Sequence, residues 1–379
     1  MKNADFVYLD NAATTTVNND VLALHNRLEN EVFANPNSIY KLGVISNDYL
    51  NKARELILKS FNLDSHKVVF TSSSTEANNL AIKGYCLHYK NRGKHIITTN
   101  IEHPSVLEVF KQLEEEFGFE VTILNVNRKG LVRLDDLRHA MRNSTILVSI
   151  MAINNEIGTV NPIAEIASIV HSYPKAVLHV DTTQAVGKIN LNYKDIDMFV
   201  VSGHKIHGLR GSGALIFRKN ISFLPLLSGG GQEYTFRSGT QSVPLACSLA
   251  KTIQLSQKDI NKRITYVASL NSYLRSELNK LDSVTFNSNE YSSPYIMNFS
   301  LLSKKASVVV EALSNNNVFV SSVSACHSKN EAMSYVVSAL GKDDKLAMNT
   351  IRISFDENNT IEEVDKFIKI FKNILETIK

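Results

Sequence analysis

The chain has 379 residues, and 44% of them are hydrophobic, which is enough for a sizeable core. At roughly 150 residues per domain, this length predicts two or three domains. The 41 basic and 37 acidic residues leave a net charge of +4, a small excess that argues against a dedicated nucleic-acid-binding protein. No apolar run approaches the length of a membrane span, and the N-terminal stretch lacks the pattern of a secretory signal.

Short apolar runs alternate with amphipathic segments through the first two thirds of the chain. The runs predict strands at 67–70, 95–99, 121–126, 146–151, 177–181, 198–202 and 213–217. Amphipathic segments between them predict helices, for example over 105–118 and 162–173. This alternation is typical of βαβ units around a parallel sheet, in which ligands bind beyond the carboxyl ends of the strands.

The pattern changes after about residue 250. The segment 247–281 predicts one long connecting helix, and weaker strands and a final helix over 361–379 follow it. We therefore expect a smaller α+β domain at the C-terminal end of the chain.

The cysteines are few and widely spaced. Cys86, Cys247 and Cys326 form neither a disulfide framework nor a zinc knuckle, so we expect a reducing, cytoplasmic compartment. Cys86 lies on a helical apolar pattern and Cys247 at the beginning of a predicted helix, so both are expected to be structural. Small residues surround Cys326, which favours an accessible loop.

Polar residues follow the predicted strands. "TSSSTEANNLAIKGY" (71–85) begins with hydroxyl residues, which would either cap a helix together with Glu76 or bind a phosphate at the helix start. Taken alone, the cap is favoured. The next strands are followed by His103, Asn155 and Asp181. Each has an ordinary interpretation: His103 as a surface residue or a buried histidine with hydrogen-bond partners, Asn155 as part of a turn, and Asp181 as a helix N-cap.

The stretch "FVVSGHKIHGLRG" (199–211) sets Lys205 between two histidines at the end of a strand. His204 and His207 have the spacing of two zinc ligands, but no third ligand is obvious nearby, so we expect no metal. The following glycines have the wrong spacing for a dinucleotide fingerprint. The Gly-rich segment 228–240 alone predicts a flexible linker.

The strand ends together favour one cofactor. Hydroxyl groups, His103, Asn155, Asp181 with Gln184, and Lys205 would suit a phosphate, an aromatic ring and a protonated ring nitrogen. Pyridoxal phosphate carries all three groups and forms a Schiff base with a lysine. Asp181 would pair with its ring nitrogen.

The chain resembles the cysteine desulfurases of the NifS/IscS type, which are fold-type I pyridoxal-phosphate enzymes of the class V aminotransferase family. The likeness runs nearly from end to end. The motifs occur in the family's order: "YLDNAATTT" (8–16), "FTSSSTEANNLAIKG", "IEHPSVLE", "INNEIGTVNPI", "HVDTTQAVGKI", "SGHKIHG", "GGGQEYTFRSGT", "SVSACHS" and "IRIS".

This resemblance implies an α/β fold with a large cofactor-binding domain over 14–255, built on a mostly parallel seven-stranded sheet. A smaller α+β domain, formed by 1–13 and 256–379, would carry the loop of the catalytic cysteine. The family pattern also implies a homodimer with shared sites.

The resemblance assigns roles to matching residues. Lys205 would bind the cofactor covalently, His103 would stack on its ring, and Cys326 would be the catalytic cysteine. Arg352 and Asn35 would bind the substrate. The cofactor-binding set would be Ser74, Thr75, His103, Asn155, Asp181, Gln184, Ser202, His204, Lys205 and, across the dimer, Thr240.

The implied reaction is sulfur removal from L-cysteine. Lys205 would take the Cα proton, and Cys326 would attack the substrate sulfur, which leaves a persulfide and L-alanine. His327 or His103 would accept the thiol proton. A sulfur-acceptor protein, in iron–sulfur cluster assembly or tRNA thiolation, would be the partner, without direct contact to nucleic acid or membrane.

Departures from the family pattern include Leu209 in place of a proline and Glu331-Ala332-Met333 after the cysteine loop. They remove no catalytic group, but they alter the surface that would meet a sulfur acceptor. Two alternatives stay open: a lyase acting on selenocysteine or a related amino acid, and a non-catalytic scaffold for sulfur-trafficking partners.

Overall fold

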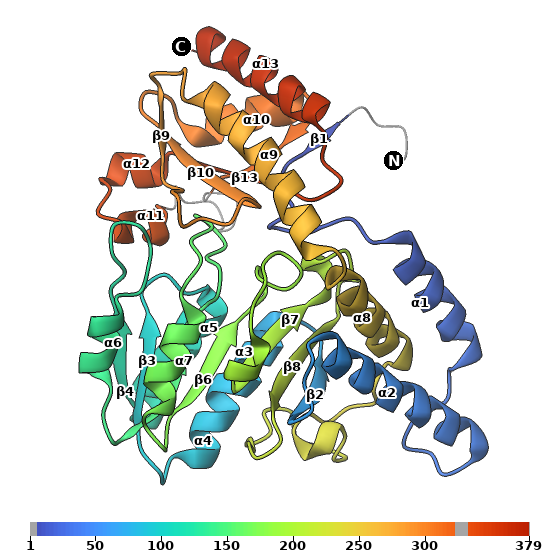
Figure 1. Cartoon of the computed structure of the whole chain (residues 1–379). Helices are drawn as coiled ribbons and strands as arrows, with labels where there is room; N and C mark the ends of the chain where they lie inside the picture. The colour runs from blue at the N-terminus through green and yellow to red at the C-terminus, as the bar shows by residue number, and fades with distance from the viewer. Residues whose placement is uncertain (1–5, 323–332, 379) are drawn as a thin grey trace.

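The computed structural model describes residues 6–322 and 333–378. Its larger part is built on a seven-stranded sheet in the order β2-β8-β7-β6-β5-β3-β4 (Figure 1). β8 runs antiparallel to both of its neighbours, and the other pairs are parallel. The strands are β2 (His66–Thr71), β3 (His95–Thr99), β4 (Glu120–Leu124), β5 (Thr145–Ser149), β6 (Val177–Asp181), β7 (Met198–Ser202) and β8 (Gly213–Arg218).

All seven strands predicted from the apolar runs are present: three have the predicted bounds, and the ends of the other four differ by at most two residues. β4 ends at Leu124 and β5 at Ser149, although the apolar runs continue to residues 126 and 151. Three of the four residues beyond the strand ends, Val126, Ile150 and Met151, stay buried, whereas Asn125 is exposed. Burial, rather than strand pairing, therefore explains the length of the apolar runs.

Helices cover both faces of this sheet, because alternate strand residues face two separate apolar layers. One layer packs on α3 (Ser74–Asn79), a π-helical segment (Leu80–Gly84), α4 (Tyr85–Tyr89) and α5 (Pro104–Phe117). The other packs on α2 (Lys41–Ser60), α6 (Leu134–Ala140), α7 (Ile163–His171) and α8 (Val243–Ser256), and α1 (Asn19–Glu31) lies against α8.

A smaller part contains a four-stranded antiparallel sheet in the order β12-β13-β10-β9 and a parallel pair, β1-β11. Its strands are β1 (Val7–Tyr8), β9 (Val284–Phe286), β10 (Ile296–Leu301), β11 (Val318–Phe319), β12 (Ser321–Ser322) and β13 (Thr350–Ser354). Its helices are α9 (Ile260–Leu278), α10 (Ala306–Asn315), α11 (Tyr335–Ala339), α12 (Asp344–Met348) and α13 (Ile361–Thr377). The chain therefore has the expected α/β and α+β parts, while the domain boundaries at 13/14 and 255/256 stay predictions.

The long connecting helix predicted over 247–281 is wrong, because the chain forms two helices there. α8 ends at Ser256, α9 begins at Ile260, and Asp259 between them has a φ of 50°. An α-helix cannot continue through a left-handed residue. α8 also begins four residues before Cys247, at Val243, with the side chain of Ser242 as its N-cap.

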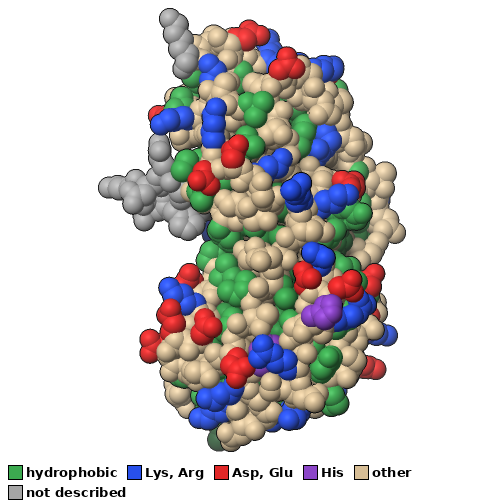
Figure 2. Space-filling view, turned by 90° about the vertical axis from the view of Figure 1, so that its left-hand side faces the viewer, with side chains coloured by type: hydrophobic (Ala, Val, Ile, Leu, Met, Phe, Trp, Pro, Cys, Tyr) green, Lys and Arg blue, Asp and Glu red, His purple; other side chains and the backbone are tan. Residues whose placement is uncertain are grey.

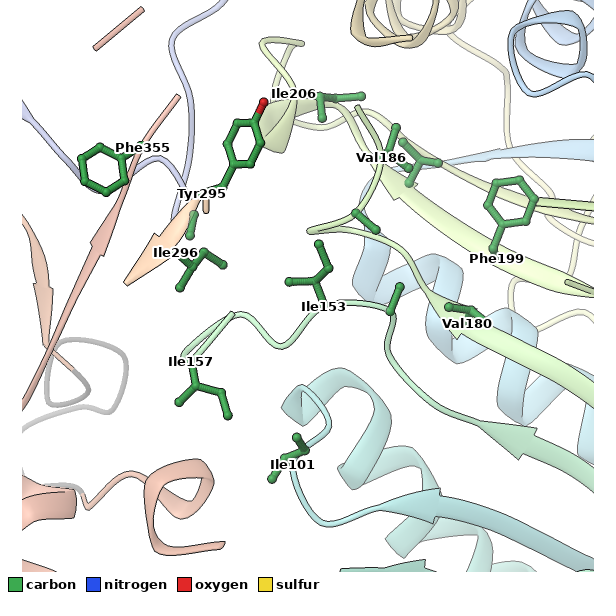
Figure 3. Close-up of a cluster of buried hydrophobic side chains, with 14 of the residues drawn as sticks. Ile101, Ile153, Ile157, Val180, Val186, Phe199, Ile206, Tyr295, Ile296 and Phe355 are labelled. Carbon is green, nitrogen blue, oxygen red and sulfur yellow. The ribbon is translucent and has the colours of Figure 1, made fainter. Parts of the chain in front are cut away.

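The smaller part lies over the carboxyl ends of the large sheet's parallel strands. One apolar cluster continues from one part to the other. In Figure 3, Tyr295 of the smaller part lies next to Ile206, which follows β7, and Phe355 lies beyond Tyr295. This packing fixes the smaller sheet above the strand ends, where the polar motifs gather.

Acidic and basic side chains alternate over the face seen in Figure 2, in keeping with the small net charge. Among the helices of the described residues, none combines the length and the apolar character that crossing a membrane would need.

Candidate active site

The N-terminal segment runs from the smaller sheet down to the strand ends and meets Lys205 there. Lys205 ends a 3-10 turn (Gly203–Lys205) directly after β7. Its Nζ donates to the carbonyls of Ala12, at 2.8 Å, and Ala13, at 2.7 Å. The amide Nε2 of Gln184 donates to the same Ala12 carbonyl at 2.9 Å. Lys205 and Gln184, from two strand ends, therefore converge on one point.

Asp181 ends β6 and is linked through two side chains to His103. Its Oδ2 accepts from Asn78 Nδ2 at 2.9 Å, and Asn78 Nδ2 also lies 2.9 Å from Ser105 Oγ. Ser105 Oγ is 2.9 Å from His103 Nδ1. The other oxygen of Asp181 accepts from Thr183 N at 2.9 Å, so the carboxylate caps a turn and not the N-terminus of a helix.

His103 is the N-cap of α5, and its Nδ1 accepts from the Ser105 backbone N–H at 3.1 Å. The neutral ring therefore carries its proton on Nε2. Surrounding protein atoms lower the pKa of this imidazole by desolvation; Lys205 lowers it further, whereas Asp181 raises it. The residue is nevertheless exposed.

The predicted phosphate-binding residues surround the start of α3 and the end of β7. Ser74 and Thr75 form the first turn of α3, and Ser73 caps it by accepting from Glu76 N at 3.2 Å. The Glu76 side chain accepts from Ser72 N and not from Ser73 N, so the predicted capping box is only half formed.

Gly213 allows this close approach of helix and strand. It pairs with Ser202 across the sheet, and a Cβ on it would lie 2.8 Å from the carbonyl carbon of Ser73. Ser202 is buried, and its Oγ has no hydrogen-bond partner among the described residues. Any side chain at position 213 would push the helix start away from the strand end.

His204 and His207 do not form a metal pair. His204 Nδ1 lies 3.2 Å from Thr14 Oγ1, and burial, followed by the charge of Lys205, lowers its pKa to about 4. His207 Nδ1 bonds the Thr16 carbonyl, and its Nε2 lies 3.5 Å from Asp356. The described ranges, 6–322 and 333–378, contain no group of three or more His, Cys, Asp or Glu that could hold a metal ion.

Arg352 lies on β13, above the strand ends. Its Nη1 donates to the Asn155 carbonyl at 2.9 Å, and its Nη2 lies 2.8 Å from Asp10 Oδ1. Its Nε is buried without a partner among the described residues, and so is Oδ1 of Asn155. The predicted substrate-binding arginine thus stands beside a predicted cofactor-binding asparagine, and both have polar atoms left to satisfy.

Asn35 and the residue after Thr240 are linked through Asn37 on one surface of the protein. Asn35 and Thr240 are both exposed. Asn37 bonds Asn35 Oδ1 and also donates to Gln241 Oε1 at 3.1 Å, which links the α1–α2 loop to the residue after Thr240.

The Gly-rich loop that carries Thr240 is not the free linker that its composition alone predicts. Its Glu233 is buried, pairs with Arg54 at 2.6 Å, and accepts from Phe70 N at 2.9 Å. The loop is therefore anchored to the body of the large part.

Cys326, with its neighbour His327, lies outside the described residues. Cys86 is fully buried in α4, and burial raises the pKa of its thiol strongly. Cys247 is partly buried in α8, its thiol faces the Tyr49 carbonyl, and burial raises its pKa to about 11. Neither thiol is set up as a nucleophile, because only the thiolate is reactive.

Four residues of this arrangement were not predicted from the sequence: Asn78, Ser105, Asp10 and Lys188. Each lies inside a quoted motif, so the motifs held the signal. Lys188 donates to Gln184 Oε1 at 2.9 Å, four residues away. Lys188 ends the turn segment 183–188, where its spacing from Gln184 does not by itself indicate a contact.

The residues present fit pyridoxal phosphate. Asp181 supplies a carboxylate at the end of β6, Lys205 follows the neighbouring β7, and the exposed imidazole of His103 follows β3 and is linked to Asp181 through Ser105 and Asn78. Buried oxygens without partners among the described residues, Ser202 Oγ, Thr183 Oγ1 and Asn155 Oδ1, lie around the same strand ends. Buried polar groups normally have partners, so these oxygens indicate a polar ligand.

Comparisons with known proteins agree with this class of fold and site. The fold is that of the fold-type I pyridoxal-phosphate enzymes: a solved structure of a NifS-like protein superimposes with a TM-score of 0.91 at 35% identity, covering 98% of this chain and 100% of that one. The chain belongs to the aminotransferase class-V family, whose model matches residues 7–367.

Relatives of known name point to one branch of this family. The cysteine desulfurase IscS of Dictyoglomus turgidum is 37% identical over 98% of this chain and 95% of its own length. The mitochondrial cysteine desulfurase of Saccharomyces cerevisiae is 39% identical over 96% of this chain and 73% of its own. A solved structure of SspA in complex with cysteine is 30% identical, with a TM-score of 0.80 over 93% of this chain and 100% of that one.

Proposed function

We propose that this chain is a pyridoxal-phosphate-dependent cysteine desulfurase, which converts L-cysteine to L-alanine and carries the sulfur as a persulfide on Cys326. The observation that carries the proposal is the meeting of Lys205 and Gln184 at the Ala12 carbonyl, beside the Asp181 network. Relatives along the whole chain are cysteine desulfurases, which supports this reaction over others of the family.

The cofactor would be held by the strand ends. Asp181 would face the ring nitrogen, His103 would cover one ring face, and Lys205 would hold the cofactor covalently. Ser74, Thr75, Ser202 and His204 would bind the phosphate at the start of α3, where free N–H groups favour an anion. When bound, pyridoxal phosphate supplies an acceptor for the electron pair released at Cα.

The substrate would be oriented by its carboxylate. Arg352 has a buried Nε without a partner among the described residues and an Nη2 that now binds Asp10. A substrate carboxylate that meets Nε and Nη2 of Arg352 would form two charge-assisted hydrogen bonds with the guanidinium. Lys205 Nζ would then take the Cα proton, for which its amine must be free and unprotonated.

The sulfur step needs no outside oxidant or reductant. The Cys326 thiolate would attack the sulfur of L-cysteine; the new S–S bond forms as the substrate's Cβ–S bond breaks, and the electron pair of that bond stays with the carbon fragment. Proton return to that fragment yields L-alanine. L-cysteine and the Cys326 thiol thus become L-alanine and a Cys326 persulfide, so atoms and electrons balance.

The proposal is tested with Lys205→Ala, measured by visible absorbance after incubation with pyridoxal phosphate and by alanine production from L-cysteine. The variant should lose both the yellow colour and the activity. Lys219→Ala is the matched control, because Lys219 is exposed and its Nζ donates to a backbone carbonyl, that of Asp64. A Lys205→Ala protein that keeps full activity would overturn the assignment.

We also propose a homodimer in which each subunit completes the other's site. The surface around Asn35 exposes large apolar side chains, Phe33 at 73% and Ile39 at 98%, with Tyr40, Leu42 and Val44 next to them. Patches of this kind mark interaction surfaces. Asn35 and Thr240 share this exposed surface, where Thr240 could reach the phosphate of a second copy.

A subunit-mixing experiment tests the shared site. Lys205→Ala and Thr240→Val proteins are each expected to have low activity, and a co-expressed mixture should regain activity because each mixed dimer holds one intact site. If mixing restores nothing although co-purification through a different affinity tag on each subunit shows mixed dimers, Thr240 serves its own subunit.

The reactive Cys326 thiol requires a reducing compartment, so we propose a cytoplasmic enzyme. Its persulfide would pass to the thiol of an acceptor protein, in iron–sulfur cluster assembly or tRNA thiolation.

A further inference from the structure

Lys188 is a buried cation that the proposed mechanism does not use. Its side chain lies in the turn region after β6, and the residue is only 8% exposed. A lysine is seldom buried in this way unless its ammonium has a partner. The partner is Gln184, whose Oε1 accepts from Lys188 Nζ at 2.9 Å.

The other end of the Gln184 amide faces the active site. Nε2 donates to the Ala12 carbonyl at 2.9 Å, and that carbonyl also accepts from Lys205 Nζ at 2.8 Å. An ammonium can only donate, so it binds the oxygen end of the amide and excludes the nitrogen end. Lys188 therefore selects one of the two orientations of Gln184.

The charges around Lys188 come from both parts of the chain. Burial lowers the pKa of Lys188 to about 7; Lys205 and Arg352 lower it as well, while Glu357 and Asp356 raise it. These two carboxylates line a cavity of about 450 Å³ that Lys188 and Lys205 also line. A Met at this position would bury the same length of chain without the desolvation cost, so packing alone does not account for a lysine.

We propose that Lys188 is a positioning residue, whose Nζ holds the oxygen of Gln184 and so turns its amide nitrogen toward the ring oxygen of the bound cofactor. The inference rests on the proposed function, because the amide donor is directed at pyridoxal phosphate. Without Lys188, the Gln184 amide can rotate and turn its oxygen toward the ring oxygen of the cofactor. The two oxygens would then repel each other.

A double-mutant cycle over Lys188→Met and Gln184→Ala tests this coupling. The readouts are the Kd for pyridoxal phosphate and the apparent pKa of the bound chromophore from absorbance titration. Lys188→Met alone should raise Kd about tenfold, because one oriented hydrogen bond of the Gln184 amide is lost, and it should shift the chromophore pKa upward, because a nearby positive charge is lost. In the Gln184→Ala background, the same substitution should leave Kd unchanged within about twofold.

Equal effects of Lys188→Met on Kd in both backgrounds would overturn the inference, since Lys188 would then act without Gln184. Lys188→Arg, which keeps a donor, should restore most of the affinity, and Lys188→Leu, which has none, replaces the Met variant if that protein does not fold. A parent protein that binds no pyridoxal phosphate would overturn the proposed function as well. A yellow parent with no coupling overturns only the role of Lys188.

Discussion

Arg352 on β13 is paired with Asp10 of the N-terminal segment, with 2.8 Å between Nη2 and Oδ1. The same segment, two and three residues further on, supplies the carbonyls of Ala12 and Ala13 that bind Lys205. One short stretch of chain thus holds both cations that the proposed reaction needs, one for the substrate carboxylate and one for the Cα proton.

Asp10→Asn should lower KM for L-cysteine about threefold, because a partly exposed ion pair of modest strength no longer competes with the substrate carboxylate. The Asn155 carbonyl would still hold the guanidinium of Arg352 in place. Steady-state kinetics checks this, with Arg352→Gln as the opposite control, for which KM should rise about 100-fold. A higher KM for Asp10→Asn would mean that Asp10 positions Arg352 instead of competing for it.

Glu102 predicts a pH dependence of stability. It is fully buried next to His103, and burial raises the pKa of its carboxyl from 4.5 to about 8, although Thr99 and Met151 N donate to Oε1. Between about pH 4.5 and about pH 8, Glu102 therefore keeps its proton in the folded state but has lost it in the unfolded state. This group makes the protein less stable as pH rises from about 4.5 to about 8, by up to about 5 kcal/mol.

Glu102→Gln should remove this contribution, so the stability difference between variant and parent should grow in favour of the variant from pH 5 to pH 9. Urea unfolding of the cofactor-free proteins at several pH values measures it. Glu108→Gln, on the exposed side of α5, should follow the parent at every pH. Parallel curves for Glu102→Gln and the parent would show that Glu102 is ionised in the folded protein.

Asn78 should be the structural link between Asp181 and Ser105. Asn78→Ala removes the donor to Asp181 Oδ2, leaving a buried carboxylate oxygen without it, and should cost about 1–3 kcal/mol of unfolding free energy. Asn79→Ala is the matched control on the same helix, because Asn79 Nδ2 donates to the Thr75 carbonyl one turn away in a solvent-exposed hydrogen bond. This substitution should change the free energy of unfolding by no more than about 0.5 kcal/mol. If urea unfolding shows the same loss of unfolding free energy for both variants, Asn78 is not the structural link between Asp181 and Ser105.

The strands and the order of polar strand ends could be predicted from sequence because both signals are local. Apolar runs gave β2 to β8 within two residues, and Asp181 and Lys205 were recognisable as polar residues at the ends of buried strands. The break at Asp259 was missed because "QKD" continues an acceptable helical pattern, and only its φ of 50° separates α8 from α9.

The side-chain pairs were less predictable. Asn78 looks like an ordinary polar residue on a helix, and its importance appears only when β6 and α5 are brought beside it. Asp10 and Arg352 are 342 residues apart, and no local pattern relates them. Lys188 and Gln184 are close in sequence, but their contact matters only because the Ala12 carbonyl lies on the other side of the amide.

The central claim is that sulfur leaves L-cysteine as a persulfide on Cys326. It is tested most directly by mass spectrometry of the alkylated protein after a single turnover with L-cysteine, comparing the parent, Cys326→Ala and Cys247→Ala. The parent and Cys247→Ala should each carry one added sulfur atom on Cys326, and Cys326→Ala should stay yellow but carry none. Added sulfur on Cys86 or Cys247, or alanine formation by Cys326→Ala at the parent rate, would contradict the account.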